Sequence, residues 1–280
     1  MKFNKIAIIG VGLIGGSIGL AVKRKKLARE IAGVCRHKQS LRRAARAGAI
    51  DKGALDYKDA VSGADLVILA APVNQIIKLA KKIIPYLKRG CLVTDAGSTK
   101  AEIVRSIEKA YARKQFHFVG AHPLAGSEKK GVIGARADLF EGALCILTRS
   151  RKTDPSALKK AAGFWSKIGC RIEVLTAERH DKIVALTSHL PHLAAAQLVK
   201  AAKGNLDFAS SGFCDTTRIA SSSAEIWADI FLTNKKFITQ AIDRYIKNLK
   251  IMRDLISRGD KARLSAEFKK IKTLRDALQK

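Results

Sequence analysis

Three glycines near the start of the chain have the spacing G-x-G-x-x-G, in the segment Gly10-Val11-Gly12-Leu13-Ile14-Gly15. An apolar run at residues 5–10 precedes them and a helix-like stretch to residue 26 follows, which is the context in which such glycines bind a dinucleotide. The three would allow a tight turn, backbone approach to a pyrophosphate, and close packing of helix on strand. The first helical turn, with Leu13 and Ile14, would direct unpaired N–H groups at that phosphate. We therefore predict dinucleotide binding rather than a simple glycine-rich turn.

Basic side chains occupy the place where a carboxylate usually selects NAD. An NAD-binding chain normally has Asp or Glu at the end of the second strand, where it bonds the ribose hydroxyls. Here the sequence is Val34-Cys35-Arg36-His37-Lys38. Arg36 could fork onto a 2′-phosphate, and His37 and Lys38 could add positive charge. We favour NADP over NAD, or use of both; the alternative is that these are surface residues of a very basic protein.

A histidine followed by a proline, His122-Pro123, has the residue type and position for acid–base chemistry. It follows a predicted strand end, and the proline holds its backbone extended where the nicotinamide should lie. A neutral imidazole there can accept a hydrogen bond from a substrate hydroxyl and raise electron density on the carbon that loses hydride. Ser98, in a turn that opens the next helix, can hold that hydroxyl or the nicotinamide amide. Considered alone, a histidine before proline is more often a packed loop residue.

Four segments carry more specific patterns than the glycines. They are Asp95-Ala96-Gly97-Ser98-Thr99-Lys100, Gly120-Ala121-His122-Pro123-Leu124-Ala125-Gly126-Ser127-Glu128, Ser188-His189-Leu190-Pro191-His192, and Asp215-Thr216-Thr217-Arg218-Ile219-Ala220 with Trp227 beyond. In this order, and with the glycines, they resemble the prephenate dehydrogenase family, which includes arogenate dehydrogenases. The resemblance covers nearly the whole chain.

The resemblance implies an oxidative decarboxylation in tyrosine biosynthesis. Hydride leaves the hydroxyl-bearing ring carbon of prephenate for NAD(P)⁺ while carbon dioxide departs, and the aromatic product is 4-hydroxyphenylpyruvate; arogenate would give tyrosine. This strongly downhill step needs no metal and no covalent intermediate. The family roles carry over to seven residues: His122 as acceptor for the 4-hydroxyl, Ser98 assisting it, Arg218 holding a substrate carboxylate, His192 at a substrate-binding position, Glu128 and Asp215 as gating or positioning carboxylates near Arg218, and Trp227 in the pocket wall.

Some of these residues, and the neighbouring His189, also have a plainer structural interpretation. Arg218 could be one more solvated cation, although it lies in a stretch of low charge and its planar fork suits a carboxylate. His189 and His192 are spaced i, i+3, as a metal pair could be, but no Cys, Asp or Glu of suitable spacing is adjacent, so we predict no metal. His189 fits a structural hydrogen-bonding role better than a substrate contact. Trp227 alone would be assigned to the core.

The elements that must position these residues change character along the chain. Strand-like runs are at residues 31–34, 66–70, 91–95, 116–119, 144–148 and 171–175, and helical patterns at 75–84, 99–111 and 155–168 separate several of them. Their alternation predicts parallel β-α-β units in one doubly wound sheet, with ligands beyond its carboxyl edge. Loops such as Ala71-Pro72-Val73 and Gly97-Ser98-Thr99 should lie there.

Beyond residue 175 only helical patterns remain, at 177–203, 223–232, 235–258 and 261–278. Pro191 should kink the first of them, because it lacks an N–H group and its ring crowds the preceding turn. We predict an α/β Rossmann-type domain at residues 1–175 and an all-helical substrate and dimerisation domain at 176–280. Helices with unpartnered apolar faces often pair with a second copy, so we expect a homodimer.

Composition narrows the function classes further. The 280 residues carry a net charge of +29, which makes anionic partners plausible on physical grounds, but Lys and Arg are spread along nearly every helix rather than clustered. Aromatic residues are only 6%, few for a protein that stacks single-stranded bases. Five widely spaced cysteines without C-x-x-C suit a reducing cytosol. The apolar start is glycine-rich and lacks a signal-peptide cleavage site, so we expect a cytoplasmic protein with no membrane or nucleic-acid partner.

Two rival functions remain at this stage. One is a β-hydroxyacid dehydrogenase-like enzyme with a helical second domain, although its catalytic lysine has no convincing counterpart near Lys200 or Lys203. The other is a non-catalytic basic nucleic-acid-binding protein, which salt-dependent DNA retention would indicate. The residues leave prephenate and arogenate open. Because little sequence follows the last helix, we expect any feedback by tyrosine to act at the active site.

Overall fold

The computed structural model describes residues 2–110, 116–126 and 131–279. Contacts within the chain group it into two compact units, Met1–Asn234 and Lys235–Lys280. The domain boundary at residue 175 stays a prediction. In the structure β9 ends at Leu175, and every described element after it is helical.

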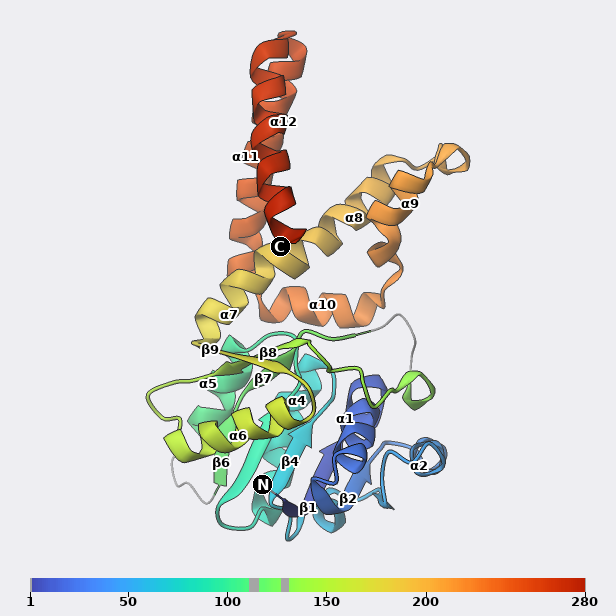
Figure 1. Ribbon diagram of the computed structural model, residues 1–280, viewed down its shortest axis with the longest axis vertical. Helices are drawn as coiled ribbons and strands as arrows, with labels where there is room; N and C mark the ends of the chain where they lie inside the picture. Colours follow the sequence, from blue (N-terminus) through green and yellow to red (C-terminus); the bar gives the residue numbers. More distant parts are fainter. Residues whose placement is uncertain (1, 111–115, 127–130, 280) are drawn as a thin grey trace. The chain divides into compact units, whose positions relative to one another are not determined.

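A six-stranded parallel sheet forms the centre of the first unit (Figure 1). Its strands are β1 (Phe3–Ile9), β2 (Ala28–Val34), β3 (Lys52–Ala54), β4 (Leu66–Leu69), β5 (Cys91–Asp95) and β6 (Phe116–Val119). They lie in the order β3-β2-β1-β4-β5-β6, and each neighbouring pair is parallel. The order reverses between β1 and β4, so a crevice for ligands opens beyond the carboxyl ends of these two strands. The predicted doubly wound sheet is confirmed.

Alternation along the strands divides the core between the two faces of this sheet. On β1, Ile6 and Ile8 belong to one buried cluster, whereas Ala7 and Ile9 belong to the other. Successive side chains of a strand point to opposite faces, and a sheet covered on both sides needs apolar residues at every position. The first cluster packs against α1 (Leu13–Arg24), α2 (Lys38–Arg46) and α6 (Pro155–Lys167), and the second against α3 (Tyr57–Val61), α4 (Val73–Ile83) and α5 (Ala101–Ala110).

A second, smaller sheet corrects one expectation from the sequence. The runs at 144–148 and 171–175 do not join the large sheet; as β8 (Leu144–Thr148) and β9 (Arg171–Leu175) they pair with β7 (Ala121–Pro123). β8 is antiparallel to β7 and parallel to β9. Only Gly120 separates β6 from β7, and so short a link cannot make the crossover that another parallel strand requires. The chain therefore turns and starts a new sheet, whose first strand, β7, has His122 as its middle residue.

The helices of the first unit beyond β9 are α7 (Ala177–Val184), α8 (Leu190–Ala201), α9 (Ser211–Thr217) and α10 (Ala224–Thr233), with the short turns η4 (Leu206–Phe208) and η5 (Arg218–Ser221). The sequence predicted a kink at Pro191; the structure shows a change of helix type directly before it. A π-helical turn, η3 (Ala185–His189), separates α7 from α8, and Pro191 lies in the first turn of α8, where its missing N–H group costs least.

The second unit is a helical hairpin of α11 (Lys235–Ser257) and α12 (Lys261–Asp276). Its turn contains Gly259 in the left-handed region, at φ +64°. Several large apolar side chains of both helices are exposed, among them Leu249, Ile256 and Phe268. Exposed apolar side chains in such a group are typical of a surface that binds another chain.

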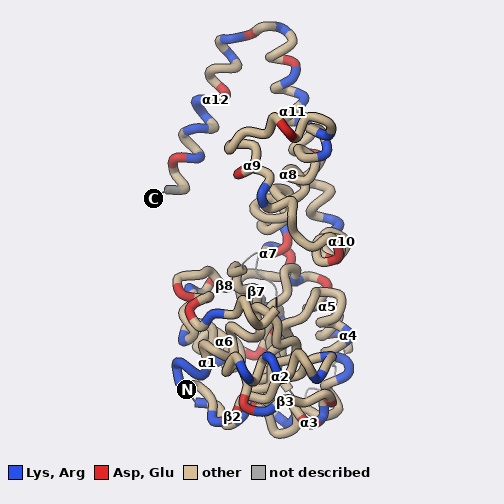
Figure 2. Tube along the Cα trace, turned by 90° about the vertical axis from the view of Figure 1, so that its right-hand side faces the viewer, with Lys and Arg blue, Asp and Glu red and all other residues tan. Residues whose placement is uncertain are grey.

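Positive charge is distributed along the segments of both units, as Figure 2 shows. No helix among the described residues is both long enough and apolar enough to span a bilayer.

Candidate active site

The glycine segment forms the turn between β1 and α1. Gly10 has φ +94°, a conformation that side chains disfavour, and a Cβ there would lie 2.3 Å from the carbonyl oxygen of Ala70. Gly12 is the N-cap of α1, and a Cβ on it would meet nothing within 4 Å. The open space at Gly12 therefore allows another group to approach the backbone at the N-terminus of α1.

A cleft of about 560 Å³ lies beyond the carboxyl ends of β1, β2 and β4. Six of the predicted cofactor residues line it: Gly10, Gly12, Arg36, His37, Ala71 and Pro72. Leu13 and Ile14 are in the first turn of α1, and Gly15 is buried beneath it, so these three shape the turn without lining the cleft. Ser98 is in the bend after β5 and does not line this cleft.

The end of the cleft at β2 is basic. Arg36 and His37 are exposed there, and Ser40 and Arg43 of α2 line the same surface. None of the described residues that line the cleft is acidic. Lys38, which the sequence suggested as a further cation, instead lines a different hollow together with Glu30 and Asp56. Lys38 is the first residue of α2 and is not among the residues that line the cleft.

One carboxylate fixes the two loops that carry Ser98 and His122. Asp95, the last residue of β5, accepts hydrogen bonds from the backbone N–H groups of Gly97 (2.9 Å) and Ala121 (3.1 Å). The same carboxylate pairs with the ammonium of Lys100, which also donates to the carbonyl oxygen of Ala121 at 2.9 Å. Asp95 and Lys100 are both fully buried. Since Gly97 precedes Ser98 and Ala121 precedes His122, this ion pair holds both predicted catalytic residues at the carboxyl edge of β5.

His122 is partly exposed, and one edge of its ring faces a second histidine. Its Nδ1 lies 2.8 Å from Nε2 of His180 on α7. Burial lowers the pKa of His122 well below its usual range, and the electrostatic influence of His180 and Lys100 on its protonated form acts in the same direction. His122 is therefore a neutral imidazole at physiological pH, as its predicted role requires.

The buried side of this histidine pair ends at a carboxylate. Nδ1 of His180 lies 2.7 Å from Oδ1 of Asp181, and both residues are buried. Asp181 also accepts hydrogen bonds from the backbone N–H groups of Lys100 (2.7 Å) and Ala101 (2.9 Å), which begin α5. Burial lowers the pKa of His180, although the bond to Asp181 opposes this. His122, His180 and Asp181 thus form a continuous hydrogen-bonded chain.

Two of the predicted substrate residues lie together in the helical part. The ring of His192 on α8 stacks on the ring of Trp227 on α10, with centroids 3.5 Å apart and planes inclined by 26°. Nδ1 of His192 lies 3.2 Å from the carbonyl oxygen of Ser188, and burial lowers the pKa of this histidine. His189 is buried 6.0 Å from the Trp227 ring, and its Nδ1 lies 3.1 Å from the amide nitrogen of Asn234.

The remaining substrate residues are less closely placed. Asp215 on α9 and Arg218 in η5 are exposed, and η5 packs against α8, the helix of His192. Glu128 lies outside the described residues. The structure thus brings His192 next to Trp227, and leaves the roles of Arg218, Asp215 and Glu128 as predictions.

Sequence reasoning missed several residues of this region, namely Ser40, Arg43, Lys100, His180, Asp181 and Asn234. Ser40 and Arg43 could have been found from the amphipathic pattern of α2, whose polar side follows Arg36 by one helical turn. The adjacent pair His180-Asp181 at the start of a predicted helix was a visible cluster of titratable residues. Nothing in its spacing linked it to His122.

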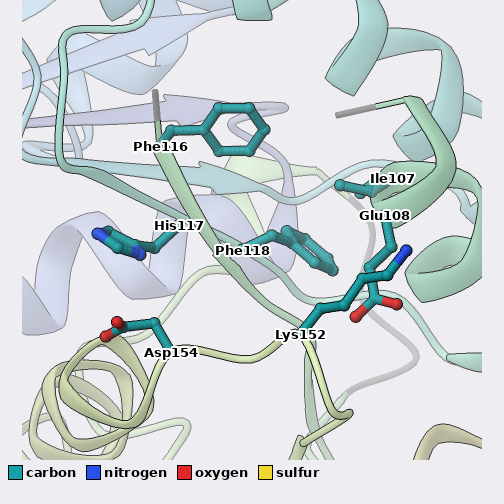
Figure 3. Close-up of a pocket in the computed structure, with 7 residues that line it drawn as sticks. All are labelled: Ile107, Glu108, Phe116, His117, Phe118, Lys152 and Asp154. Atoms are coloured by element: carbon teal, nitrogen blue, oxygen red, sulfur yellow. The ribbon is translucent and has the colours of Figure 1, made fainter. Parts of the chain in front are cut away.

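A smaller hollow, shown in Figure 3, lies at the start of β6, between α5 and the segment that precedes α6. His117 and Asp154 lie on one side of it, and Glu108 and Lys152 on the other. It contains none of the predicted site residues, and it lies at the amino end of β6 rather than at the carboxyl edge.

Comparisons with known proteins agree with this arrangement. The family description "Prephenate dehydrogenase, nucleotide-binding domain" matches residues 18–174, and "Prephenate dehydrogenase, dimerization domain" matches residues 176–270. A prephenate dehydrogenase from Bacillus subtilis (strain 168) is 35% identical over 283 residues, which span 98% of this chain and 76% of that protein. A cyclohexadienyl dehydrogenase from Zymomonas mobilis subsp. mobilis is 34% identical, over 99% of this chain and 97% of that one. Among solved structures, prephenate dehydrogenase from A. aeolicus in complex with hydroxyphenyl propionate and NAD⁺ matches with a TM-score of 0.94, at 33% identity and 99% coverage of both chains.

Proposed function

The chain belongs to the prephenate dehydrogenase family, and we propose that it catalyses the NAD(P)-dependent oxidative decarboxylation of prephenate or arogenate. The observation that supports this proposal is a neutral, partly exposed His122 that follows Ala121, whose backbone N–H group bonds to Asp95 at the carboxyl end of β5. The products would be 4-hydroxyphenylpyruvate from prephenate and tyrosine from arogenate, each with carbon dioxide and a reduced nicotinamide.

The glycine turn fits a dinucleotide. Gly12 leaves open space at the N-terminus of α1, where unpaired N–H groups and the helix dipole favour a pyrophosphate. The cleft continues from there to Arg36, His37 and Arg43, which would hold the ribose end. When bound, the nicotinamide supplies the acceptor for the hydride.

His122 and Ser98 would act on the hydroxyl-bearing carbon of the substrate ring. The neutral imidazole accepts the hydroxyl hydrogen bond, which raises electron density on that carbon and weakens its C–H bond toward hydride loss. Ser98, at the bend before α5, would orient the same hydroxyl. Loss of hydride and carbon dioxide leaves an aromatic phenol that keeps the hydroxyl proton, so the histidine holds this proton only transiently.

The helical part would bind the rest of the substrate. The stacked rings of His192 and Trp227 would form a flat wall against the substrate ring. The exposed, planar guanidinium group of Arg218 suits a substrate carboxylate. We include Asp215 and Glu128 in this proposal as positioning carboxylates near Arg218, on the family resemblance.

We propose NADP as the preferred cofactor, with NAD as the alternative. The support is electrostatic: the cleft beyond β2 has two arginines and a histidine, and none of its described lining residues is acidic. A 2′-phosphate would be attracted there, whereas ribose hydroxyls would lack the carboxylate that usually accepts from them.

A homodimer is part of the same proposal. The matched dimerization-domain description and the exposed apolar side chains of α11 and α12 both support it. We also propose a cytoplasmic location, which the free thiols of all five cysteines would suit.

The test is a spectrophotometric matrix of prephenate and arogenate against NAD⁺ and NADP⁺, with the purified full chain. Reduction of either cofactor that depends on one of the two substrates supports the proposal, and the ratio of kcat/KM values settles both preferences. Absence of turnover in all four combinations, with a folded dimer, would overturn it.

A further inference from the structure

The carboxylate of Asp181 is surrounded by hydrogen-bond donors. It accepts from the backbone N–H groups of Lys100 at 2.7 Å and Ala101 at 2.9 Å, and its Oδ1 lies 2.7 Å from Nδ1 of His180. A carboxylate that already accepts from two backbone groups has only lone pairs to offer a third partner. Nδ1 of His180 must therefore carry a proton.

This assignment determines the protonation of the next ring. A neutral imidazole with a proton on Nδ1 has a lone pair on Nε2. Nε2 of His180 lies 2.8 Å from Nδ1 of His122, so Nδ1 of His122 must be the donor in that hydrogen bond. The lone pair of His122 is then on Nε2, the ring nitrogen that His180 does not contact.

We propose that His180 and Asp181 are positioning residues that hold His122 as its Nδ1–H tautomer, with Nε2 free to accept the hydrogen bond of the substrate hydroxyl. This inference rests on the proposed function for its catalytic meaning, but the tautomer itself is a property of the free protein. Without such a partner, the opposite tautomer would present an N–H donor to the substrate, and the acceptor role would be lost.

The surroundings of the pair keep both rings neutral. The titratable groups that face them are Asp95 at the end of β5, Lys100 just before α5 and His189 from η3, in addition to Asp181. Burial is the largest effect and lowers the pKa of both His122 and His180. A doubly protonated His180 would have no lone pair for His122, so this neutrality is necessary for the proposed tautomer.

The hydrogen bonds from His122 through His180 to Asp181 also stabilise the charge that develops during the reaction. As the hydroxyl proton shifts toward Nε2 of His122, positive charge spreads through the Nδ1–H bond to His180, which faces the Asp181 carboxylate. The proton then returns to the phenol oxygen of the product, so the three residues end each turnover in their starting protonation states. This is how a carboxylate in a serine-protease triad supports its histidine.

The decisive experiment reads the tautomer directly in the substrate-free full chain. The protein has six histidines, so ¹⁵N–¹H correlation spectra of the imidazole rings are tractable, and His122→Asn assigns the catalytic ring. We expect His122 to show a protonated Nδ1 and an unprotonated Nε2 at neutral pH. A protonated Nε2 in the parent protein overturns the inference, whatever its activity.

Two substitutions of His180 then test the cause. Phenylalanine keeps the ring volume but offers no lone pair, so in His180→Phe we expect His122 to change tautomer and kcat to fall about 100-fold, within the range for acid–base groups, with KM changed less than about threefold. In His180→Gln the amide can both accept from His122 and donate to Asp181, so we expect the Nδ1–H tautomer to return and kcat to recover at least about tenfold.

The control is His117→Gln. This histidine takes no part in the hydrogen-bonded series of His122, His180 and Asp181, so its substitution should alter neither the His122 signals nor kcat. Should His180→Phe fail to fold, His180→Gln and the parent spectrum still decide the matter. An unchanged His122 tautomer in a folded His180→Phe variant would refute positioning by His180. If the parent protein and every variant lacked turnover while His122 showed the expected tautomer, the result would count against the proposed function and not against this inference.

Discussion

Gly15 lies so close to Gly10 that a Cβ on Gly15 would be 2.1 Å from the carbonyl oxygen of Gly10. At Gly12, between them, a Cβ would meet nothing within 4 Å. Two glycines of one motif therefore serve different purposes: Gly15 allows α1 to pack on β1, and Gly12 keeps the approach to the backbone open. The distinction gives opposite expectations for the same substitution.

We expect Gly15→Ala to lower stability and Gly12→Ala to weaken cofactor binding. The alanine methyl at residue 15 must displace backbone, and such overpacking costs about 1–3 kcal/mol, which urea unfolding measures. The methyl at residue 12 fits the free protein, but it should raise the KM for the cofactor about tenfold, which corresponds to about 1.4 kcal/mol. If Gly12→Ala left this KM unchanged while Gly15→Ala was fully stable, the motif would not form the proposed turn.

The pH dependence of kcat should reflect the environment of His122. A histidine with the usual pKa of about 6.5 would lose its neutral, active form near that pH. Burial instead lowers the pKa of His122, so its active neutral form persists to lower pH, and we expect the acid limb of kcat to lie below 6.5. His122→Asn should reduce kcat about 10²- to 10⁴-fold. An acid limb that survived unchanged in this variant would belong to another group, and His117→Asn provides the matched control.

The cofactor preference should depend on the basic end of the cleft. We expect Arg36→Asp to lower kcat/KM for NADP⁺ about 10- to 100-fold, since a charge-assisted hydrogen bond contributes about 1.5–3 kcal/mol. The value for NAD⁺ should stay unchanged or rise. Lys38→Asp makes the same charge change just outside the cleft and should shift neither value as strongly. A comparable kcat/KM for NAD⁺ in the parent, unaffected by Arg36→Asp, would remove the NADP preference.

Arg218→Ala should mainly raise the KM for the substrate. A carboxylate contact that is equal in the ground state and the transition state affects binding and not kcat. Loss of this contact should raise KM about 10- to 100-fold, and lysine at the same position should restore only part of it. Lys203→Ala removes an exposed cation at another place and serves as the control. If steady-state kinetics gave the parental KM, Arg218 would lie outside the substrate site.

Protein stability should decrease in weak acid because of His189. Burial lowers the pKa of His189 to about 4, so between pH 6.5 and 4 the unfolded chain binds a proton there that the folded chain does not. Stability is therefore full above pH 6.5 and falls as the pH is lowered. At pH 5 the loss from this residue is about 2 kcal/mol relative to pH 7. In His189→Gln, urea unfolding at the two pH values should differ by correspondingly less; an equal difference would contradict the assignment.

Much of the fold follows from local patterns in the sequence. The alternation of apolar runs with helical periodicity predicted the parallel sheet, because strands covered on both faces must be apolar throughout. The glycine spacing predicted the β1–α1 turn, and Pro191 indicated an irregularity where the π-helical turn η3 precedes α8. The small second sheet was not predicted, since one residue, Gly120, decides the direction of the chain after β6, and periodicity carries no such information.

The same division applies to the site. Sequence alone determined the chemical types: a histidine before a proline, an arginine in a stretch of low charge, and basic residues where a carboxylate was expected. Only the tertiary structure decided that His180 contacts His122, although 58 positions separate them. A hydrogen bond depends on distance and direction in space, and the helix that carries His180 reaches β7 only through the folding of every element between them. The proton position on His122 is therefore a property of the folded chain, and no local pattern could have specified it.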